Sequence, residues 1–166
     1  FRRVLFRSIS TVATEFISAY YYKLSFSPAE VPKFYDQENA LIWRQELERR
    51  DGVDFNTASK FLVPEIVKGS KVVIYDYTML KNEKGFLLTV CGYIKHENEE
   101  KKEFQQIFEV EEIDGKYAIV KDILRYAKYT KEEQEEELES KLIKIARKVN
   151  VGNKKKGRAS KFVYKA

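Results

Sequence analysis

Residues 104–126 constrain the fold of this 166-residue chain more than any other stretch. Their sequence, FQQIFEVEEIDGKYAIVKDILRY, alternates apolar and polar residues on both sides of Asp114-Gly115. Alternation with a period of two is typical of a half-buried strand, and Asp-Gly is a favoured turn between antiparallel strands. The stretch therefore predicts a β-hairpin whose strands cover residues 104–113 and 116–126.

Two more segments with the same period precede this hairpin. Residues 71–80 and 86–96 are rich in β-branched and aromatic side chains, and a short polar segment, 82–85, separates them. Short connections favour consecutive antiparallel hairpins, because a parallel pair needs a long crossover. We therefore expect four long strands in one curved antiparallel sheet.

The chain before residue 71 has the period of helices instead. Apolar residues recur at helical spacing over residues 9–24, which predicts an amphipathic helix. Ser27 as N-cap and Pro28 in the first turn predict a second short helix that ends near Phe34-Tyr35. Further expectations are a strand over 40–43, a charged loop over 44–54, and a third helix to about Val67 that Asn56 or Thr57 caps.

Helices followed by strands indicate an α+β domain, with the helices on the concave side of the sheet. No apolar run approaches the roughly 20 residues that span a bilayer, so no membrane association is expected. The single cysteine, Cys91, excludes a disulfide within the chain. We expect it to be a buried, unreactive thiol in a reducing compartment.

The two ends of the chain differ from its body. Residues 1–8, FRRVLFRS, are what one reading frame of a common sequencing-adapter oligonucleotide encodes, and we expect them to be non-native. The folded domain is expected over residues 9–129, followed by a charged helix over 130–149 with acidic residues first and basic residues last. The formal net charge of +5 comes from the ends, since residues 9–140 hold more acidic than basic side chains.

Residues 150–166 are expected to form a flexible basic tail. Its cations alternate with Phe162 and Tyr164, a mixture that suits contact with RNA phosphates and stacking on bases. A nuclear localisation signal and a merely solvated tail are alternatives that the sequence leaves open. The predicted RNA-contacting residues are Lys154, Lys155, Lys156, Arg158 and Lys161.

Four motifs in this order resemble the nuclear transport factor 2 family over about residues 9–129. They are the Glu-Phe-x-x-x-Tyr-Tyr at 15–21, the Phe-Tyr at 34–35, the Gln-x-Phe at 106–108 and the Asp-x-x-Arg-Tyr at 122–126. The resemblance implies a cone-shaped fold with helices on a curved sheet. The Arg-Tyr ending followed by acidic residues is most similar to the Ras-GAP-binding, stress-granule scaffold branch.

That branch implies a homodimer with a hydrophobic groove for short Phe-containing (FG-type) peptides. The positions that match the groove are Val12, Phe16, Phe34 and Leu124, where Leu124 replaces the usual Phe. Core packing alone would also explain Val12 and Phe16, so both interpretations remain open. The resemblance implies a cytoplasmic ribonucleoprotein component without cofactor or metal.

Enzymes are a second class, because relatives of this fold use the concave pocket for general acid–base catalysis. The candidates are few: His96 ends a strand beside an acidic loop, Asp76 lies within a strand, and Asp122 belongs to the family block with an expected hydrogen-bonding role. No Gly-rich phosphate loop, metal-ligand spacing or Gly-x-Ser-x-Gly motif occurs. We therefore expect no catalysis.

A third possibility is the Ran carrier of the family, which would bind Ran-GDP and FG-repeat nucleoporins and shuttle through the nuclear pore. Trp43 and the acidic loop residues Glu97 and Glu99 resemble that carrier. Arg44 departs from it, because the carrier has an acid directly after the Trp. The small subunit of mRNA exporters is a further alternative, with a heterodimer in place of the homodimer.

Overall fold

The computed structural model describes residues 8–63, 71–126 and 131–155. It separates into one compact unit over Phe1–Ala127 and a second over Lys128–Ala166. The first unit contains a six-stranded sheet in the order β2-β1-β6-β5-β4-β3. The four long strands predicted from the sequence are confirmed, as β3 (Lys71–Lys81), β4 (Gly85–Lys95), β5 (Lys102–Ile113) and β6 (Lys116–Tyr126).

The sheet is mixed, whereas the sequence predicts an antiparallel one. The long strands pair antiparallel, but β1 (Leu41–Arg44) runs parallel to β6, with Ile42 level with Asp122. A parallel pair needs a long connection, and the hairpins β3 to β6 supply it. Register shifts at Ile74/Asp76 and Glu109/Val110 are β-bulges, which increase the local bend and twist of the strands.

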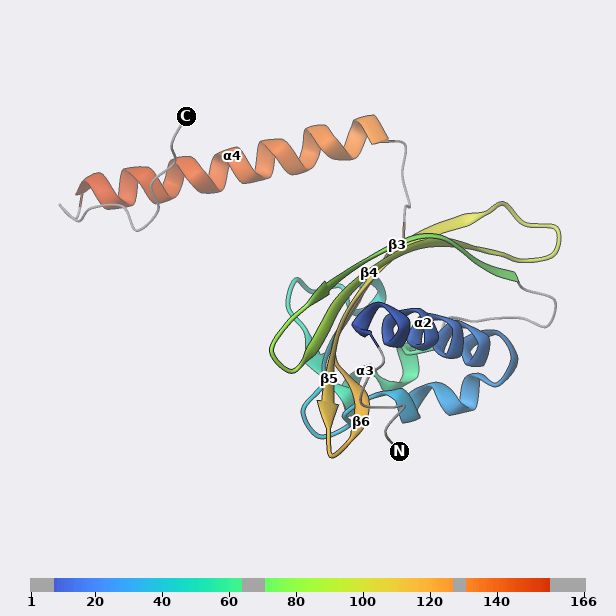
Figure 1. Ribbon diagram of the computed structural model, residues 1–166. Helices are drawn as coiled ribbons and strands as arrows, with labels where there is room; N and C mark the ends of the chain where they lie inside the picture. The colour runs from blue at the N-terminus through green and yellow to red at the C-terminus, as the bar shows by residue number, and fades with distance from the viewer. Residues whose placement is uncertain (1–7, 64–70, 127–130, 156–166) are drawn as a thin grey trace. The chain divides into compact units, whose positions relative to one another are not determined.

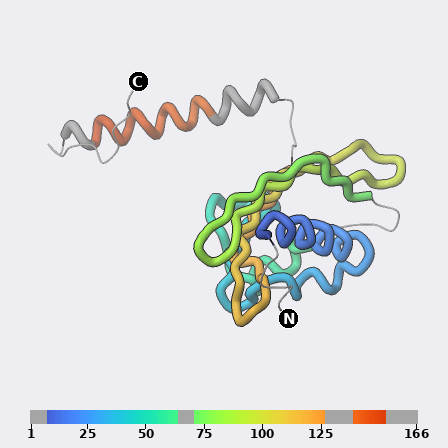
Figure 2. Tube along the Cα trace, viewed as in Figure 1, coloured from blue at the N-terminus to red at the C-terminus, as the bar shows by residue number. Residues whose placement is uncertain are grey.

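Helix α2 (Ile9–Phe26) lies in the hollow of the curved sheet (Figure 1). The Ser8 side chain caps its first turn by accepting a hydrogen bond from the Thr11 amide. The apolar face of α2 enters the core through Ala13, Phe16, Ile17, Tyr20 and Leu24, as the helical spacing predicts. The trace in Figure 2 shows the long strands arching over this helix.

The second helix is the 3₁₀-helix η1 (Pro28–Phe34), with Pro28 at its start as predicted. Ser27 stands at the N-cap but its side chain makes no capping hydrogen bond, which corrects the expected role of that residue. Glu30 pairs with Lys23 of α2 instead, at 2.6 Å. This ion pair connects η1 to α2.

Residues 44–54 are not the loop that their charges suggest. Arg44 belongs to β1 and is fully buried, and the segment continues through η2 (Gln45–Leu47) to β2 (Val53–Asp54). Asp54, rather than Asn56 or Thr57, caps α3 (Phe55–Ala58) by accepting from the Thr57 amide at 2.8 Å. Helix η3 (Ser59–Phe61) follows, and Val67 lies outside the described residues.

The second unit contains α4 (Lys131–Lys155), which ends later than the expected boundary at Val149. Its exposed apolar residues include Leu142, Ile145 and Val149. Within the described ranges, none of the helices is both long and apolar enough to cross a membrane.

Candidate functional site

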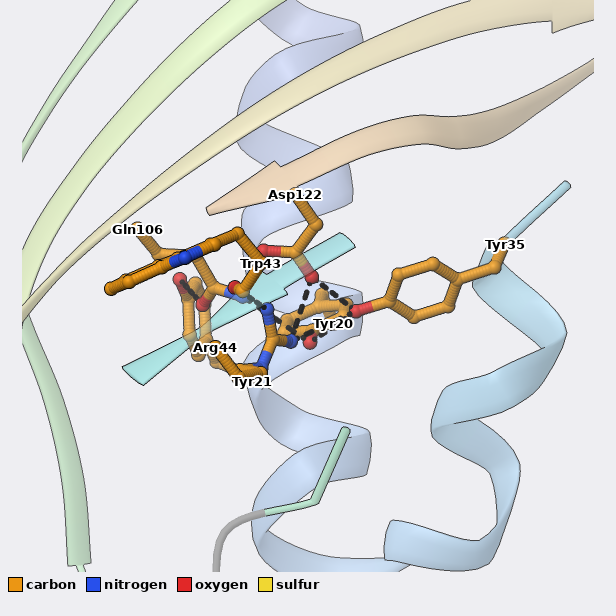
Figure 3. A network of polar contacts seen from close by, with 7 residues as sticks. All are labelled: Tyr20, Tyr21, Tyr35, Trp43, Arg44, Gln106 and Asp122. Atoms are coloured by element: carbon orange, nitrogen blue, oxygen red, sulfur yellow. Dashed lines mark hydrogen bonds and ion pairs between the residues drawn. The ribbon is translucent and has the colours of Figure 1, made fainter. Parts of the chain in front are cut away.

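The interior of the sheet holds a network of polar side chains around Arg44 and Asp122 (Figure 3). Ile42 of β1 pairs with Asp122 of β6, and Arg44 pairs with Leu124. All four side chains are buried, so the alternation of the two strands turns Arg44 and Asp122 to the same inner face. Arg44 Nη2 donates to Asp122 Oδ2 at 2.8 Å, and both side chains are at most 1% exposed. The two opposite charges therefore compensate each other inside the core.

Two tyrosines extend the network towards α2 and η1. The Tyr35 hydroxyl donates to Asp122 Oδ2 at 2.5 Å, and the Tyr20 and Tyr35 hydroxyl oxygens lie 3.0 Å apart. Tyr35 follows η1 directly, while Tyr20 lies one turn beyond Phe16 on α2. The carboxylate thus joins the helices to the sheet.

Gln106 and Tyr21 complete the network on the other side. Gln106 Nε2 donates to Asp122 Oδ1 at 3.0 Å, and the Tyr21 hydroxyl donates to Gln106 Oε1 at 2.7 Å. Gln106 is buried, and it belongs to the Gln-x-Phe motif of β5. The motif residue therefore orients the carboxylate from the neighbouring strand.

The tyrosines of the network are held neutral. Burial, reinforced by the charge of Asp122, raises the pKa of Tyr20 to about 12. Burial likewise raises the pKa of Tyr21 and of Tyr35 well above the ordinary value. Burial lowers the pKa of Arg44, but Asp122 and Tyr35 raise it more, so that its pKa lies well above the usual value. One cation and one anion are the stable charges of this network.

This arrangement leaves little space for a substrate. Phe16, Tyr20, Tyr21, Phe104 and Phe108 fill the hollow of the sheet with ring contacts of 5.0–6.4 Å between centroids. Among the described residues, the cavity beside Tyr20, Tyr21 and Gln106 measures about 10 Å³, roughly one water molecule. The network holds the fold together, and its Asp122 and tyrosines face one another rather than an open pocket.

Among the described residues, no group of His, Cys, Asp and Glu side chains has the arrangement of a metal site. His96 is half-buried just after β4, and Asp76 is exposed on β3. Cys91 is half-buried, which corrects the expected burial of its thiol. The Asp122 carboxylate instead accepts hydrogen bonds from Tyr35, Arg44 and Gln106.

The predicted groove residues divide between two places. Phe16 and Phe34 meet edge to face, with ring centroids 6.0 Å apart, and Phe34 is half-buried. Val12, one turn before Phe16, is half-buried and packs on the core. Leu124 is almost fully buried and instead lines the small cavity with Tyr20, Tyr21 and Leu24.

The predicted RNA-contacting residues lie at the end of α4 and beyond it. The backbone of Lys154 and Lys155 belongs to the last turn of α4. Lys156, Arg158 and Lys161 lie outside the described residues.

Arg44 is the residue that sequence reasoning missed. Within a charged stretch, a basic side chain resembles a loop residue, and its partner Asp122 lies 78 positions away. The one available signal was Asp122 itself, because a carboxylate between apolar strand residues needs a buried partner.

A model of the nuclear transport factor 2 (NTF2) domain matches residues 12–126. The solved structure of nuclear transport factor 2 from Cryptosporidium parvum is 15% identical, with a TM-score of 0.60 and coverage of 71% of this chain and 94% of that chain. The yeast UBP3-associated protein BRE5 is 15% identical, with a TM-score of 0.59 and coverage of 74% and 99%.

A putative ketosteroid isomerase from Shewanella frigidimarina is 10% identical, with a TM-score of 0.56 and coverage of 71% of this chain and 98% of that chain. A search of the curated proteins finds no match. At these identities, the likeness to solved structures concerns the fold alone.

Proposed function

The chain belongs to the NTF2 domain family, and on that premise we propose that it is a non-catalytic, homodimeric scaffold that binds short Phe-containing peptide motifs. The family fold occurs in a putative isomerase as well as in a transport factor. The choice between catalysis and binding therefore depends on the side chains of this chain.

The filled interior supports binding rather than catalysis. A substrate pocket of this fold would occupy the hollow of the sheet, where the described aromatic rings and the Asp122 network enclose a cavity of about 10 Å³. Each carboxylate oxygen of Asp122 already accepts a hydrogen bond from a buried partner. A general base must instead reach a substrate proton, so this carboxylate is better suited to holding the fold.

Phe34 carries the proposal for peptide binding. Its ring is half-buried and stands edge-on to Phe16 at 6.0 Å and close to Tyr20 at 5.4 Å. A second phenyl ring that packs against such a cluster gains apolar burial and the offset or edge contacts that aromatic pairs prefer. Val12 would form the adjacent apolar wall, and Phe16 the floor.

Leu124 has an indirect place in this proposal. It lines the small cavity together with Tyr20, whose ring in turn contacts Phe34. We propose that Leu124 supports the site from below through Tyr20. A leucine in place of the usual phenylalanine keeps that support apolar.

We propose that the homodimer forms through the outer face of the sheet, over β3 to β5. Leu80 pairs with Leu87 across β3 and β4, and Thr89 pairs with Ile107 across β4 and β5. Leu80 is 62% exposed, and the half-buried Leu87, Thr89 and Ile107 continue it as a largely apolar strip on the face opposite α2. Such a strip is a common site of self-association.

Two parts of the proposal rest on sequence and on relatives. A solved complex of yeast deubiquitinase Ubp3 with its Bre5 cofactor, 17% identical to this chain, offers a precedent for protein binding by this fold. The accessory RNA contact through Lys154, Lys155, Lys156, Arg158 and Lys161 rests on their charge, with a localisation signal as its alternative. We infer a cytoplasmic location.

The alternative function is transport, with Ran-GDP and FG-repeat nucleoporins as partners, or an mRNA-export heterodimer. Trp43 favours it as a sequence match. Against it, the residue after Trp43 is the buried Arg44, whose charge belongs to the interior network.

A pull-down separates these functions. Immobilised Phe-motif peptides and immobilised Ran-GDP are each offered to the wild-type chain, to Phe34→Ala and to Phe26→Ala. Phe26 is 73% exposed on α2 and serves as the matched aromatic control. The scaffold is supported if the peptides capture the wild-type chain and Phe26→Ala but not Phe34→Ala. Capture of the wild-type chain by Ran-GDP would contradict the scaffold and favour the carrier.

A further inference from the structure

A cavity of about 220 Å³ opens on the outer face of the sheet where β1 meets β6. Its walls are Leu41 and Trp43 of β1, Lys121, Ile123 and Arg125 of β6, and Arg50 of the segment between β1 and β2. Leu41 pairs with Lys121 and Trp43 pairs with Ile123 across the two strands. Because Ile42 and Arg44 face the core, Leu41 and Trp43 face the opposite side, away from α2.

The indole of Trp43 is fixed within this cavity. Its Nε1 donates to the carbonyl oxygen of Arg49 at 2.7 Å, which ties β1 to the following segment. The Arg125 guanidinium lies over the ring, 4.4 Å from the centroid. This cation–π contact holds a charged group at the mouth of the cavity in a defined position.

The cavity has an excess of positive charge. Lys121 pairs with Glu109 at 3.1 Å. Asp122 is the one acidic residue that lines the cavity, but its carboxylate faces the core, where it pairs with Arg44. The neighbouring Arg49 is paired with Asp51. Over the part of the chain that the structure describes, no ion pair occupies Arg50 or Arg125. Both guanidinium groups are available for an anion.

Apolar surface accompanies these charges. Leu41 is 52% exposed and Ile123 is 37% exposed. Arginine forks bind carboxylates in a bidentate manner, and an aliphatic side chain beside them would cover Leu41 and Ile123. We propose that this cavity, the β1–β6 pocket, binds an acidic peptide segment in which an aliphatic side chain stands next to carboxylates.

A peptide fits this pocket better than RNA. Binding of single-stranded nucleic acid commonly adds base stacking on an aromatic ring to its phosphate contacts, and Arg125 already lies over one face of Trp43. Residues 9–140 hold more acidic than basic side chains, so they repel both kinds of anion. An extended polyphosphate meets this repulsion along its length, whereas a short acidic peptide in the pocket lies within the screening length of the pocket cations. The pocket is separate from Phe34, so it adds a second partner site to the proposed scaffold.

Trp43 provides the test, because it is the only tryptophan of the chain. Its fluorescence is followed while the full chain is titrated with the probe acetyl-Glu-Asp-Leu-Asp-Glu-amide. The control ligand is acetyl-Gln-Asn-Leu-Asn-Gln-amide, which has the same shape without the charges. We expect the Trp43 fluorescence to change saturably with the acidic probe and the control ligand to bind about tenfold more weakly. Added NaCl should lower the affinity for the acidic probe.

Two adjacent arginines give a matched pair of variants. Arg50→Ala is expected to lower the affinity for the acidic probe about tenfold. Arg49 lies outside the pocket walls, so Arg49→Ala should change that affinity less than about twofold. Phe34→Ala leaves the titration unchanged, so a failure of the peptide groove is told apart from a failure of this pocket. Circular dichroism confirms that each variant is folded.

Several results would overturn the proposal. They are a Trp43 signal that never saturates, equal affinity for the two ligands, or an Arg50→Ala variant that binds like wild type. Tighter binding of oligouridylate than of the acidic probe would assign the pocket to RNA. A second copy of the chain that covers the pocket would leave Trp43 insensitive at every concentration.

Discussion

Arg44 and Asp122 form an ion pair of 2.8 Å between two parallel neighbouring strands, although 78 positions separate them in the chain. Asp122 also accepts from Tyr35 and Gln106, so one carboxylate joins β1, β5, β6 and the segment after η1. Tyr20 and Tyr21 of α2 complete the network. The polar residues of the hollow therefore hold the helices on the sheet, while the aromatic residues fill it.

Removal of the Asp122 charge should destabilise the fold strongly. Asp122→Asn keeps the shape of the side chain but leaves Arg44 as an uncompensated buried cation, which costs about 3–5 kcal/mol of unfolding free energy. Urea denaturation measures the change. The exposed pair of Arg49 and Asp51 supplies the control, since Asp51→Asn should leave the urea midpoint essentially unchanged.

Replacement of both Arg44 and Asp122 should lower the free energy of unfolding less than the two single replacements together. Arg44→Met together with Asp122→Leu removes the buried cation and the buried anion at the same time, so the double variant should lose less stability than the sum of the single variants. A double-mutant cycle by urea denaturation measures this difference. Strict additivity would contradict the direct coupling of the two side chains.

Alkaline pH should weaken the fold through its buried tyrosines. The folded-state pKa of Tyr20 is about 12, whereas an unfolded tyrosine ionises near about 10. The stability from the neutral phenol is thus complete below pH 10 and is lost as the pH rises from 10 to 12. The difference between the folded and unfolded pKa of Tyr20 corresponds to about 3 kcal/mol of unfolding free energy.

Urea unfolding of wild type and Tyr20→Phe at pH 9, 10 and 11 checks this expectation. The variant should lose less stability over the same interval, because one ionisable phenol is gone. A wild-type free energy of unfolding that stays constant from pH 9 to 11 would contradict the burial of these hydroxyls.

Gly85 should not tolerate a side chain at the start of β4. A Cβ atom there would lie 2.0 Å from the carbonyl oxygen of Val110, a backbone atom of the paired strand. Gly85→Ala should therefore cost more than about 2 kcal/mol of unfolding free energy. Gly52→Ala is the control, since its nearest atom would be at an ordinary 3.5 Å. Thermal unfolding of both variants compares them, and equal melting temperatures would contradict the close approach.

A single substitution on the outer face of the sheet should halve the molecular mass of the proposed dimer in solution. Ile107→Glu places a charge within the apolar strip on the outer face of the sheet, so it should convert the dimer into a monomer. Multi-angle light scattering measures the mass of wild type, of Ile107→Glu and of the control Tyr22→Glu, an exposed site on α2. A wild-type chain that is monomeric would instead favour a subunit of a heterodimer.

The long strands were predictable because their period of two extends over many residues and their turns are short. Helix α2 was predictable for the same reason, with its own period. The parallel pairing of β1 was not, since a strand of four residues carries almost no periodic signal and its partner is distant. The burial of Arg44 was hidden for a related reason: local sequence cannot indicate a long-range ion pair.

The site was predictable only in part. The sequence identified Phe16 and Phe34, and the structure brings their rings together. It did not indicate that Leu124 would lie with Tyr21 and Leu24, because the curvature of the sheet decides which inward residues are neighbours. The β1–β6 pocket depends on the hydrogen bond from Trp43 to Arg49 and on the pairing of β1 with β6. No local sequence motif indicates either contact.

Isothermal titration calorimetry measures whether Phe34 forms a site for Phe-containing peptides. The wild-type chain and the Phe34→Ala and Phe26→Ala variants are each titrated with one FG-type peptide and with the same peptide carrying Ala for Phe. We predict binding by wild type and Phe26→Ala, with affinity reduced at least about tenfold by Phe34→Ala or by loss of the peptide Phe. Equal affinity of wild type and Phe34→Ala for the FG-type peptide would contradict the account.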